Sequence, residues 1–196
     1  MNYLGHALFS FGDAEILLGN TIADFVKGRD QYSYPPRMQQ GIQLHRAIDA
    51  FTDAHPATTD AKKFFRPHYG LYAGVFTDVV WDYFLANDET LFTNESLKAF
   101  TTSVYQSLAQ HQQWFPPRFA AMFPFMQQQD WLYNYRTPEG ISNSFGGLVR
   151  RARYMTDHQT ASAIFLKHLP QLQRLYHVFA PDVKFFAKVR YQEIIG

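Results

Sequence analysis

The fold of this chain is decided mainly by residues 69–86, whose sequence is YGLYAGVFTDVVWDYFLA. They form the most apolar candidate helix of the chain, and Asn87 and Asp88 close it because both residue types favour turns. A helix that is apolar on most of its surface needs neighbours on several sides. We therefore predict that this helix lies at the centre of the molecule.

Apolar residues keep helical spacing on both sides of this stretch. We predict further helices over residues 14–27, 37–54, 95–114 and 138–153, a shorter one from Pro117, and helical sequence over 157–180. Asp13 and Gly28 are a suitable cap and stop for the first of these helices. Pro170 is expected to kink or divide the stretch 157–180, and Pro181 to open a last helix. No run alternates apolar and polar residues between glycine turns, as a half-buried sheet requires. The prediction is an all-α, single-domain helical bundle over residues 1–196.

The composition limits the classes of protein to be considered. Hydrophobic residues make up 46% of the chain, including 19 Phe and 12 Tyr, which supplies a large aromatic core and excludes intrinsic disorder. Eighteen Lys and Arg against seventeen Asp and Glu give a net charge of +1, so the basic excess of a nucleic-acid-binding protein is missing. Cysteine is absent, so any metal must bind to histidines and carboxylates.

The start of the chain predicts neither a secretory signal nor a membrane anchor. No Lys or Arg precedes its apolar stretch, and no stretch approaches the ~18 consecutive apolar residues of a transmembrane helix. We expect a cytoplasmic protein that binds neither nucleic acid nor membranes.

Polar residues occur inside two of the apolar candidate helices. In residues 41–56, GIQLHRAIDAFTDAHP, the side chains of His45, Asp49 and Asp53 recur every four residues. This spacing places them on one helix face, about 6 Å apart. Asp78 and Asp82 repeat the spacing within the apolar stretch 69–86. Carboxylates on such a helix need a cation or a hydrogen-bond donor, because burying them without one is costly.

Asp24 stands in the apolar segment LLGNTIADFVKG, and His6 stands in YLGHALF. Oxygen and nitrogen ligands without sulfur favour a divalent ion such as Mn²⁺, Mg²⁺, Fe²⁺ or Zn²⁺. An open position on such an ion can hold a water that is nucleophilic at neutral pH. The pattern therefore predicts metal-assisted hydrolysis.

Each of these residues also has a structural interpretation. His6 fits a hydrogen-bonded core histidine, Asp53 fits a helix-end cap, and Asp82 fits a buried pair with an arginine. It is the combination of Asp24, His45 and Asp78 on three apolar helices that favours a ligand site, since three unrelated buried polar groups would be costly.

The segment GGLVRRARY places Arg150, Arg151 and Arg153 on one helical turn. Arginines near a helix C-terminus are favoured by the helix dipole, which is the interpretation as solvated surface. Their planar groups also suit bidentate binding of phosphate or of an acidic protein surface. Nearby, Asn143 and the pair Gly146–Gly147 either let a ligand approach the backbone or permit tight helix packing.

Several of these segments, taken in order, resemble the acyl carrier protein phosphodiesterase family. They are MNYLGHALFS, GNTIADFVKG, GIQLHRAIDAFTD, TDVVWDYFL, DWLYNYR and LVRRAR. The resemblance extends over residues 1–153. It implies an all-α fold related to the HD-domain metal phosphohydrolases and a divalent cation, usually manganese. It also implies hydrolysis of the phosphodiester that joins 4'-phosphopantetheine to a serine of acyl carrier protein, which gives the apo carrier protein and free 4'-phosphopantetheine.

The chain lacks the adjacent His–Asp pair of the HD signature, so the ligands are assigned from the residues above. We place the metal on Asp24, His45 and Asp78, with His6 as a fourth ligand and Asp49 or Asp82 as orienting or additional ligands. Arg46 is expected to reach the phosphate or to pair with Asp49. Arg150, Arg151 and Arg153 are the candidate contacts for the acidic carrier protein.

Two other functions are considered beside this leading hypothesis. One is an HD-like hydrolase acting on a nucleotide or another small phosphoester, because a shared fold does not fix a substrate. The other is a non-catalytic helical module that binds an acidic carrier protein through its arginines. The sequence predicts no oligomeric state.

Overall fold

The computed structural model describes residues 1–152, 155 and 157–196. In this part of the chain the α-helices are α1 (Tyr3–Leu8), α2 (Ala14–Ile22), α3 (Pro36–Ala54), α4 (Pro56–Tyr69), α5 (Ala73–Ala86), α6 (Asn94–Ala109), α7 (Pro117–Gln128), α8 (Trp131–Asn134), α9 (Pro138–Arg151), α10 (Gln159–Lys167) and α11 (Leu169–Ile195). Short 3₁₀ segments cover Ala23–Phe25, Gly28–Ser33, Gly70–Tyr72 and Gln112–Trp114. The described residues contain no β-strand, which confirms the all-α prediction.

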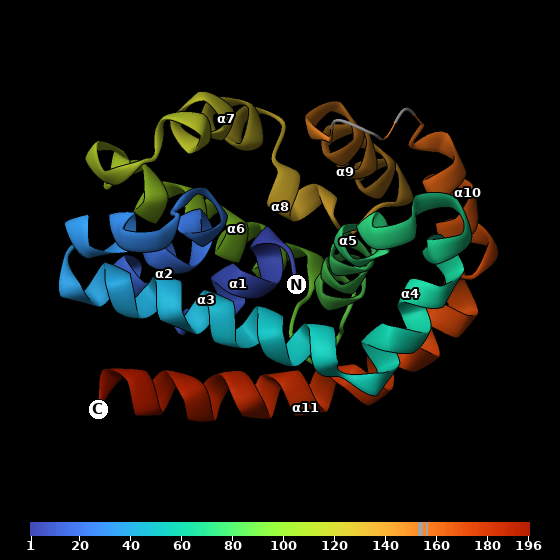
Figure 1. Ribbon diagram of the computed structural model, residues 1–196, viewed down its shortest axis with the longest axis horizontal. Helices are drawn as coiled ribbons and strands as arrows, with labels where there is room; N and C mark the ends of the chain where they lie inside the picture. The colour runs from blue at the N-terminus through green and yellow to red at the C-terminus, as the bar shows by residue number, and fades with distance from the viewer. Residues whose placement is uncertain (153–154, 156) are drawn as a thin grey trace.

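Helix α5 packs against α1, α4, α9 and α11, so the prediction of a central helix is confirmed (Figure 1). Trp81 of α5 is fully buried and stacks on Phe179 of α11, with the ring centres 5.2 Å apart. Its indole nitrogen donates a 3.2 Å hydrogen bond to the hydroxyl of Thr58 in α4. The aromatic residues of the sequence thus form the contacts between the central helix and its neighbours.

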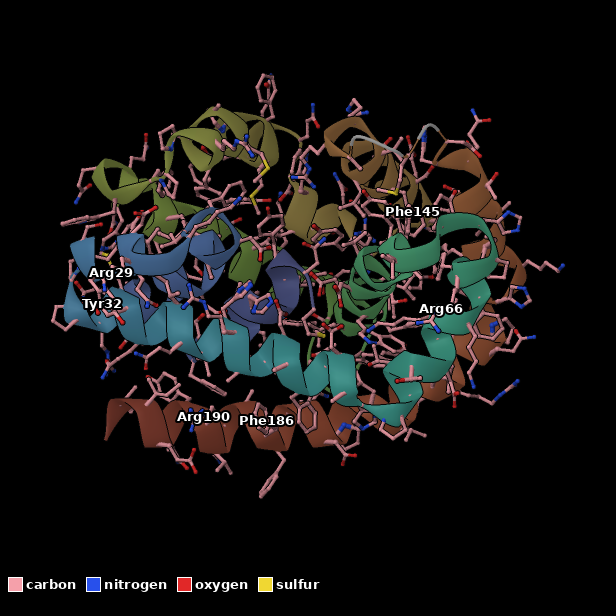
Figure 2. The ribbon with its side chains drawn as sticks, viewed as in Figure 1. Arg29, Tyr32, Arg66, Phe145, Phe186 and Arg190 are labelled. Atoms are coloured by element: carbon pink, nitrogen blue, oxygen red, sulfur yellow. The ribbon has the colours of Figure 1, made fainter. Side chains whose placement is uncertain are left out.

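Helix α3 lies between α2 and α11 (Figure 1). On the α11 side, Phe51 stacks on Phe186 at 4.3 Å between ring centres. Figure 2 shows Phe186 on the side of α11 that faces α3. On the α2 side two glycines face each other. A Cβ on Gly19 would lie 2.0 Å from the carbonyl oxygen of Met38, and a Cβ on Gly41 would lie 2.4 Å from that of Ile16. Because neither glycine has a side chain, the backbones of α2 and α3 touch directly.

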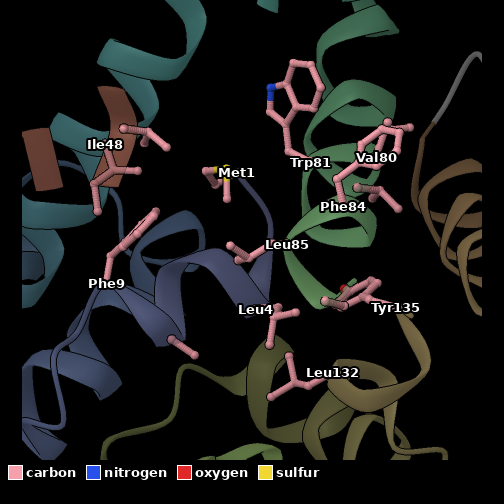
Figure 3. Packing of buried hydrophobic residues seen from close by; sticks show 14 of the residues in the cluster. Met1, Leu4, Phe9, Ile48, Val80, Trp81, Phe84, Leu85, Leu132 and Tyr135 are labelled. Carbon is pink, nitrogen blue, oxygen red and sulfur yellow. The ribbon is translucent and has the colours of Figure 1, made fainter. Parts of the chain in front are cut away.

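The N-terminal segment enters the core with α1. Leu4 is fully buried and lies near Leu85 of α5 and Leu132 of α8, while Met1 lies between Ile48 and Trp81 (Figure 3). These contacts fix the short helix α1 at the centre of the molecule. None of the described helices combines the length and apolarity that crossing a membrane requires.

Helix ends follow the predictions in part. Asp13 caps α2 as predicted, by accepting hydrogen bonds from the amides of Glu15 and Ile16. Helix α2 ends at Ile22, earlier than predicted, and a 3₁₀ turn follows it.

The prediction that Pro181 opens a last helix is wrong, because Pro181 lies inside α11. Pro170 occupies the first turn of that helix, where a proline loses no hydrogen bond. Phe179 and Val183, on either side of Pro181, are buried. The packing of this face therefore offsets the helix hydrogen bond that Pro181 cannot make.

Candidate metal centre

Two imidazole rings stack in the interior, His6 from α1 and His45 from α3. Their centres are 3.9 Å apart and their planes differ by 17°. Both residues are buried, at 2% and 5% exposure. Each ring directs its Nδ1 at Asn20 of α2: His6 lies 2.7 Å from the side-chain oxygen of Asn20, and His45 lies 2.7 Å from its backbone oxygen. One residue of α2 therefore orients both rings.

These contacts determine which ring nitrogens carry protons. A backbone carbonyl only accepts, so His45 donates from Nδ1. The Asn20 amide nitrogen donates to the backbone oxygen of His6 at 2.8 Å and to the hydroxyl of Ser10 at 3.1 Å. Its oxygen is then the acceptor for His6 Nδ1. In its neutral form each ring therefore has an unprotonated Nε2 on the side away from Asn20.

Both Nε2 atoms face Asp49 of α3. His6 Nε2 lies 3.1 Å from one carboxylate oxygen and His45 Nε2 lies 3.0 Å from the other. One ligand atom from each of these three residues falls within 4.8 Å of the other two. Asp24, from the 3₁₀ turn after α2, adds an oxygen 3.2 Å from His45 Nε2, and its side chain is 71% exposed.

The pKa values of the two imidazoles shift in opposite directions. Burial and the neighbouring His45 ring lower the pKa of His6 to about 4, so His6 is neutral. Burial alone would lower the pKa of His45 as well, but hydrogen bonds to Asp24 and Asp49 outweigh it and raise that pKa to about 9. Burial opposes ionisation of Asp49, yet the hydrogen bond with His45 and the charge of the Met1 amino group hold its pKa well below the usual range.

The contact between His6 and Asp49 is the observation that tests whether a metal fits. His6 Nε2 carries a lone pair when the ring is neutral, and Asp49 is ionised, so two acceptor atoms face each other at 3.1 Å. A cation between them turns this contact into an attractive one. Two imidazole nitrogens with carboxylate oxygens are a donor set suited to Mn²⁺, Fe²⁺ or Zn²⁺. The residues present therefore fit a divalent ion.

Asp82 of α5 has a different role from the predicted ligand. It is fully buried, and burial raises its pKa to about 7. One oxygen accepts from the amide of Leu4 at 2.7 Å, and the other accepts from those of Asn2 and Gly5 at 3.1 and 3.3 Å. Its oxygens are thus engaged by the first amides of α1, so Asp82 caps the helix that carries His6. It makes no ion pair with an arginine among the described residues.

Asp78, the other acidic residue of α5, lies closer to the cluster of His6, His45 and Asp49. One of its oxygens is 2.9 Å from the amino nitrogen of Met1, and this nitrogen is 3.6 Å from Asp49. Burial raises the pKa of Asp78. Of the three residues that we assigned first as ligands, the structure brings Asp24 and His45 together and places Asp78 beside them.

Asp24, Asp49 and Asp78 line one cleft of about 580 Å³, called the acidic cleft below. Aromatic side chains, among them Tyr3 and Phe25, form other parts of its wall. Arg151, at the end of α9, also lines this cleft, and its guanidinium donates to the sulfur of Met122 at 3.1 Å. The volume is in the range of ligand sites, and carboxylates with a nearby arginine suit a metal ion and an anionic substrate together.

Comparison with known proteins identifies the family of this chain. The model of the acyl carrier protein phosphodiesterase family matches residues 1–183. This chain belongs to that family. The match includes His6, His45 and Asp49, and it extends beyond residues 1–153, over which the sequence motifs resemble this family.

Relatives named acyl carrier protein phosphodiesterase cover most of the chain. The one from Yersinia pestis is 31% identical over 93% of this chain and 95% of its own length, and the one from Photorhabdus laumondii is 31% identical over 92% of both. One from Salmonella paratyphi A is 34% identical over 77% of this chain and 79% of its own length. No solved structure matches.

The structure does not bring Arg46 to the cleft of this family member. Its guanidinium donates to the side chain of Gln31 at 2.7 Å and to the backbone oxygen of Val26 at 3.4 Å. Successive helical residues point about 100° apart, so a residue next to His45 faces another direction. Asp53 lies one turn beyond Asp49 and pairs with Lys62 at 2.7 Å, outside the cleft.

The predicted arginine cluster divides. Arg151 lines the acidic cleft, while Arg150 is exposed and lines a neighbouring groove. Arg153 lies outside the described residues.

Asn20, which orients both histidines, was not predicted from the sequence. A signal was present, because Asn20 is a polar residue in the apolar helix α2, in the same segment as Asp24. The direct contact of Gly19 with Gly41 was also missed. This contact brings the backbone oxygen of Asn20 within reach of His45.

Proposed function

We propose that this protein is a metal-dependent phosphodiesterase that releases 4'-phosphopantetheine from holo acyl carrier protein and leaves the apo carrier protein. The observation that carries the metal dependence is the contact between the neutral His6 ring and ionised Asp49 inside an acidic cleft. The names of the relatives supply the substrate. We place the activity in the cytoplasm, as the sequence predicts.

His6, His45 and Asp49 would hold the metal, with Asp24 as a further oxygen ligand. A divalent cation bound there supplies Lewis-acid stabilisation of the phosphoryl charge and lowers the pKa of water. Mn²⁺ is the ion we expect.

The remaining residues orient and bind. Asn20 holds both rings with their Nε2 atoms toward the cleft. Asp82 fixes α1, and with it the position of His6. Arg151 would bind the non-bridging oxygens of the phosphodiester, which carry its negative charge. Water adds to phosphorus, the bond from phosphorus to the serine oxygen breaks, and that oxygen leaves with a proton as the hydroxyl of the apo carrier protein.

The direct test is incubation of the protein with holo acyl carrier protein and Mn²⁺, followed by mass spectrometry of both products. We expect apo carrier protein and 4'-phosphopantetheine in equal amounts, no turnover in EDTA, and recovery when Mn²⁺ is restored. Asp53→Ala, on the same helix as Asp49, should keep wild-type turnover, because the Asp53 carboxylate pairs with Lys62 outside the cleft. A wild-type protein that leaves holo carrier protein intact in Mn²⁺ but cleaves nucleotide phosphoesters would overturn the substrate assignment. A wild-type protein that binds carrier protein without cleaving any diester would favour the non-catalytic alternative.

A further inference from the structure

A second hollow of about 320 Å³, called the side groove below, borders the acidic cleft. Its described lining comes mainly from α8, α9 and the N-terminal segment. Four residues line both hollows: Asn2, Tyr3, Leu148 and Arg151. Because the two hollows share this wall, one ligand can occupy both.

The chemistry of the two hollows differs. The acidic cleft has three carboxylates, whereas the described lining of the side groove includes neither Asp nor Glu. Its polar groups are instead the amides of Asn2, Gln129, Asn134 and Asn143, the hydroxyl of Ser144, and the basic side chains of Arg150, Arg151 and His158. The amides and the hydroxyl suit a neutral segment that carries its own donors and acceptors, and the arginines suit the phosphate to which such a segment is joined.

The buried hydroxyl of Tyr135 also points to a ligand. Tyr135 lines the side groove and is 1% exposed. Its oxygen accepts a 3.1 Å hydrogen bond from the amide of Asn2, but its own proton has no acceptor among the described residues. Burial raises its pKa well above the usual range, so the hydroxyl stays a donor. A carbonyl group in the groove would satisfy it.

Gly146 and Gly147 of α9 line the side groove. Glycine inside a helix destabilises it relative to alanine, so a pair of them needs a reason. A Cβ on Gly147 would meet only the Arg150 side chain, at 3.8 Å, so packing does not require this glycine. Gly140 of the same helix is different, because its Cβ would lie 1.9 Å from the Asn134 backbone oxygen. Of the two interpretations given for this segment in the sequence, close approach of a ligand therefore suits Gly147 better.

We infer that the side groove binds the pantetheine arm of the substrate while the phosphodiester lies in the acidic cleft. The arm is uncharged and contains two amides and a hydroxyl, which match the asparagines, Ser144 and Tyr135. Arg151, on the shared wall, would then lie where the arm joins its phosphate. The carrier protein itself would stay outside, at the mouth of the cleft. This assignment rests on the proposed function.

The inference is tested by a substitution that places a larger side chain in the side groove. Gly147→Leu adds a side chain at the groove wall and improves helix propensity, so a loss of function would not be due to a weaker helix. Gly74→Leu is the matched control, since Gly74 is also helical, lines neither hollow, and its Cβ would meet only the Lys62 side chain. We expect Gly147→Leu to raise KM for holo carrier protein by about tenfold or more. Its rate on bis(4-nitrophenyl) phosphate, a diester without the arm, should be unchanged.

Calorimetric titration with pantetheine, which lacks the phosphate, tests the groove without any turnover. Wild-type protein and Gly74→Leu should bind it, and Gly147→Leu should bind at least about tenfold more weakly. The exposed amide variant Asn143→Ala should weaken binding less. Equal pantetheine binding and equal KM in wild type and Gly147→Leu would overturn the inference, even while the wild type releases 4'-phosphopantetheine. Pantetheine binding that Gly147→Leu abolishes, in a wild type without hydrolysis, would support the groove and refute the proposed function instead.

Discussion

Helices α3 and α5 carry acidic residues at the same spacing and use them differently. On α3, His45 and Asp49 converge with His6 into a group whose ligand atoms lie within 4.8 Å of one another. On α5, Asp82 turns to the backbone amides that begin α1. A spacing of four residues determines which helix face a carboxylate lies on. The group opposite that face decides what the carboxylate binds. Asp49 faces imidazoles and is suited to share a cation with them, whereas Asp82 faces a helix N-terminus and accepts hydrogen bonds from its N–H groups.

The largest effect is expected at Asp49. Asp49→Ala removes the carboxylate that faces both imidazoles, so kcat on holo carrier protein should fall by roughly three orders of magnitude. The protein should stay folded, because the Asp49 side chain is 38% exposed and leaves no cavity in the core. Turnover rates, compared at equal helical content by circular dichroism, test this. Normal activity per folded molecule would mean that His6, His45 and Asp49 form only a structural hydrogen-bond network.

The opposite pattern is expected at Asp82. Asp82→Ala leaves three amides of the α1 N-terminus without their acceptor, so the free energy of unfolding should fall by about 2–4 kcal/mol. Urea unfolding in EDTA measures this loss without a contribution from metal binding. If Asp82→Ala keeps the stability of the wild type but no longer binds Mn²⁺, then Asp82 is a metal ligand, and α5 and α3 use their carboxylates in the same way.

A change at Asn20 tests how the rings of His6 and His45 are oriented. Asn20→Ala removes the acceptor of His6 Nδ1 but keeps the backbone oxygen that fixes His45. Affinity for Mn²⁺ should fall by roughly 10- to 100-fold, as is common when a partner of a ligating histidine is lost. Calorimetric titration with Mn²⁺ gives the value, and Asn87→Ala, an exposed amide at the end of α5, is the control. Equal affinities in the two variants would contradict this role.

The smallest effect is expected at Asp53, the third acidic position of the α3 pattern. Its pair with Lys62 is exposed, and such pairs contribute less than about 1 kcal/mol. Asp53→Ala should therefore change neither the thermal midpoint by more than a few degrees nor kcat by more than about twofold. A large loss of activity would extend the functional part of α3 by one turn.

Local sequence predicted much of the fold because its signals are local. The predicted helix 37–54 corresponds to α3, Pro36–Ala54, and His55 with Pro56 ends it as expected. Pro181 was misplaced because the packing of Phe179 and Val183 offsets a local penalty, and such packing depends on distant residues.

The same distinction applies to the site. Polar residues in apolar segments led to His6, Asp24, His45 and Asp49, which the structure brings together. The partner of Asp82 could not be predicted, since the α1 amides are almost eighty residues away in the chain. The orienting role of Asn20 likewise depends on the direct contact of α2 with α3.

A crystal grown with Mn²⁺ and measured at the manganese absorption edge is the most direct test of the metal site. We predict one strong anomalous peak between His6 Nε2, His45 Nε2 and the Asp49 carboxylate, with none at Asp82. A peak on the α5 carboxylates, or no peak beside His6, His45 and Asp49 at saturating Mn²⁺, would contradict this metal site.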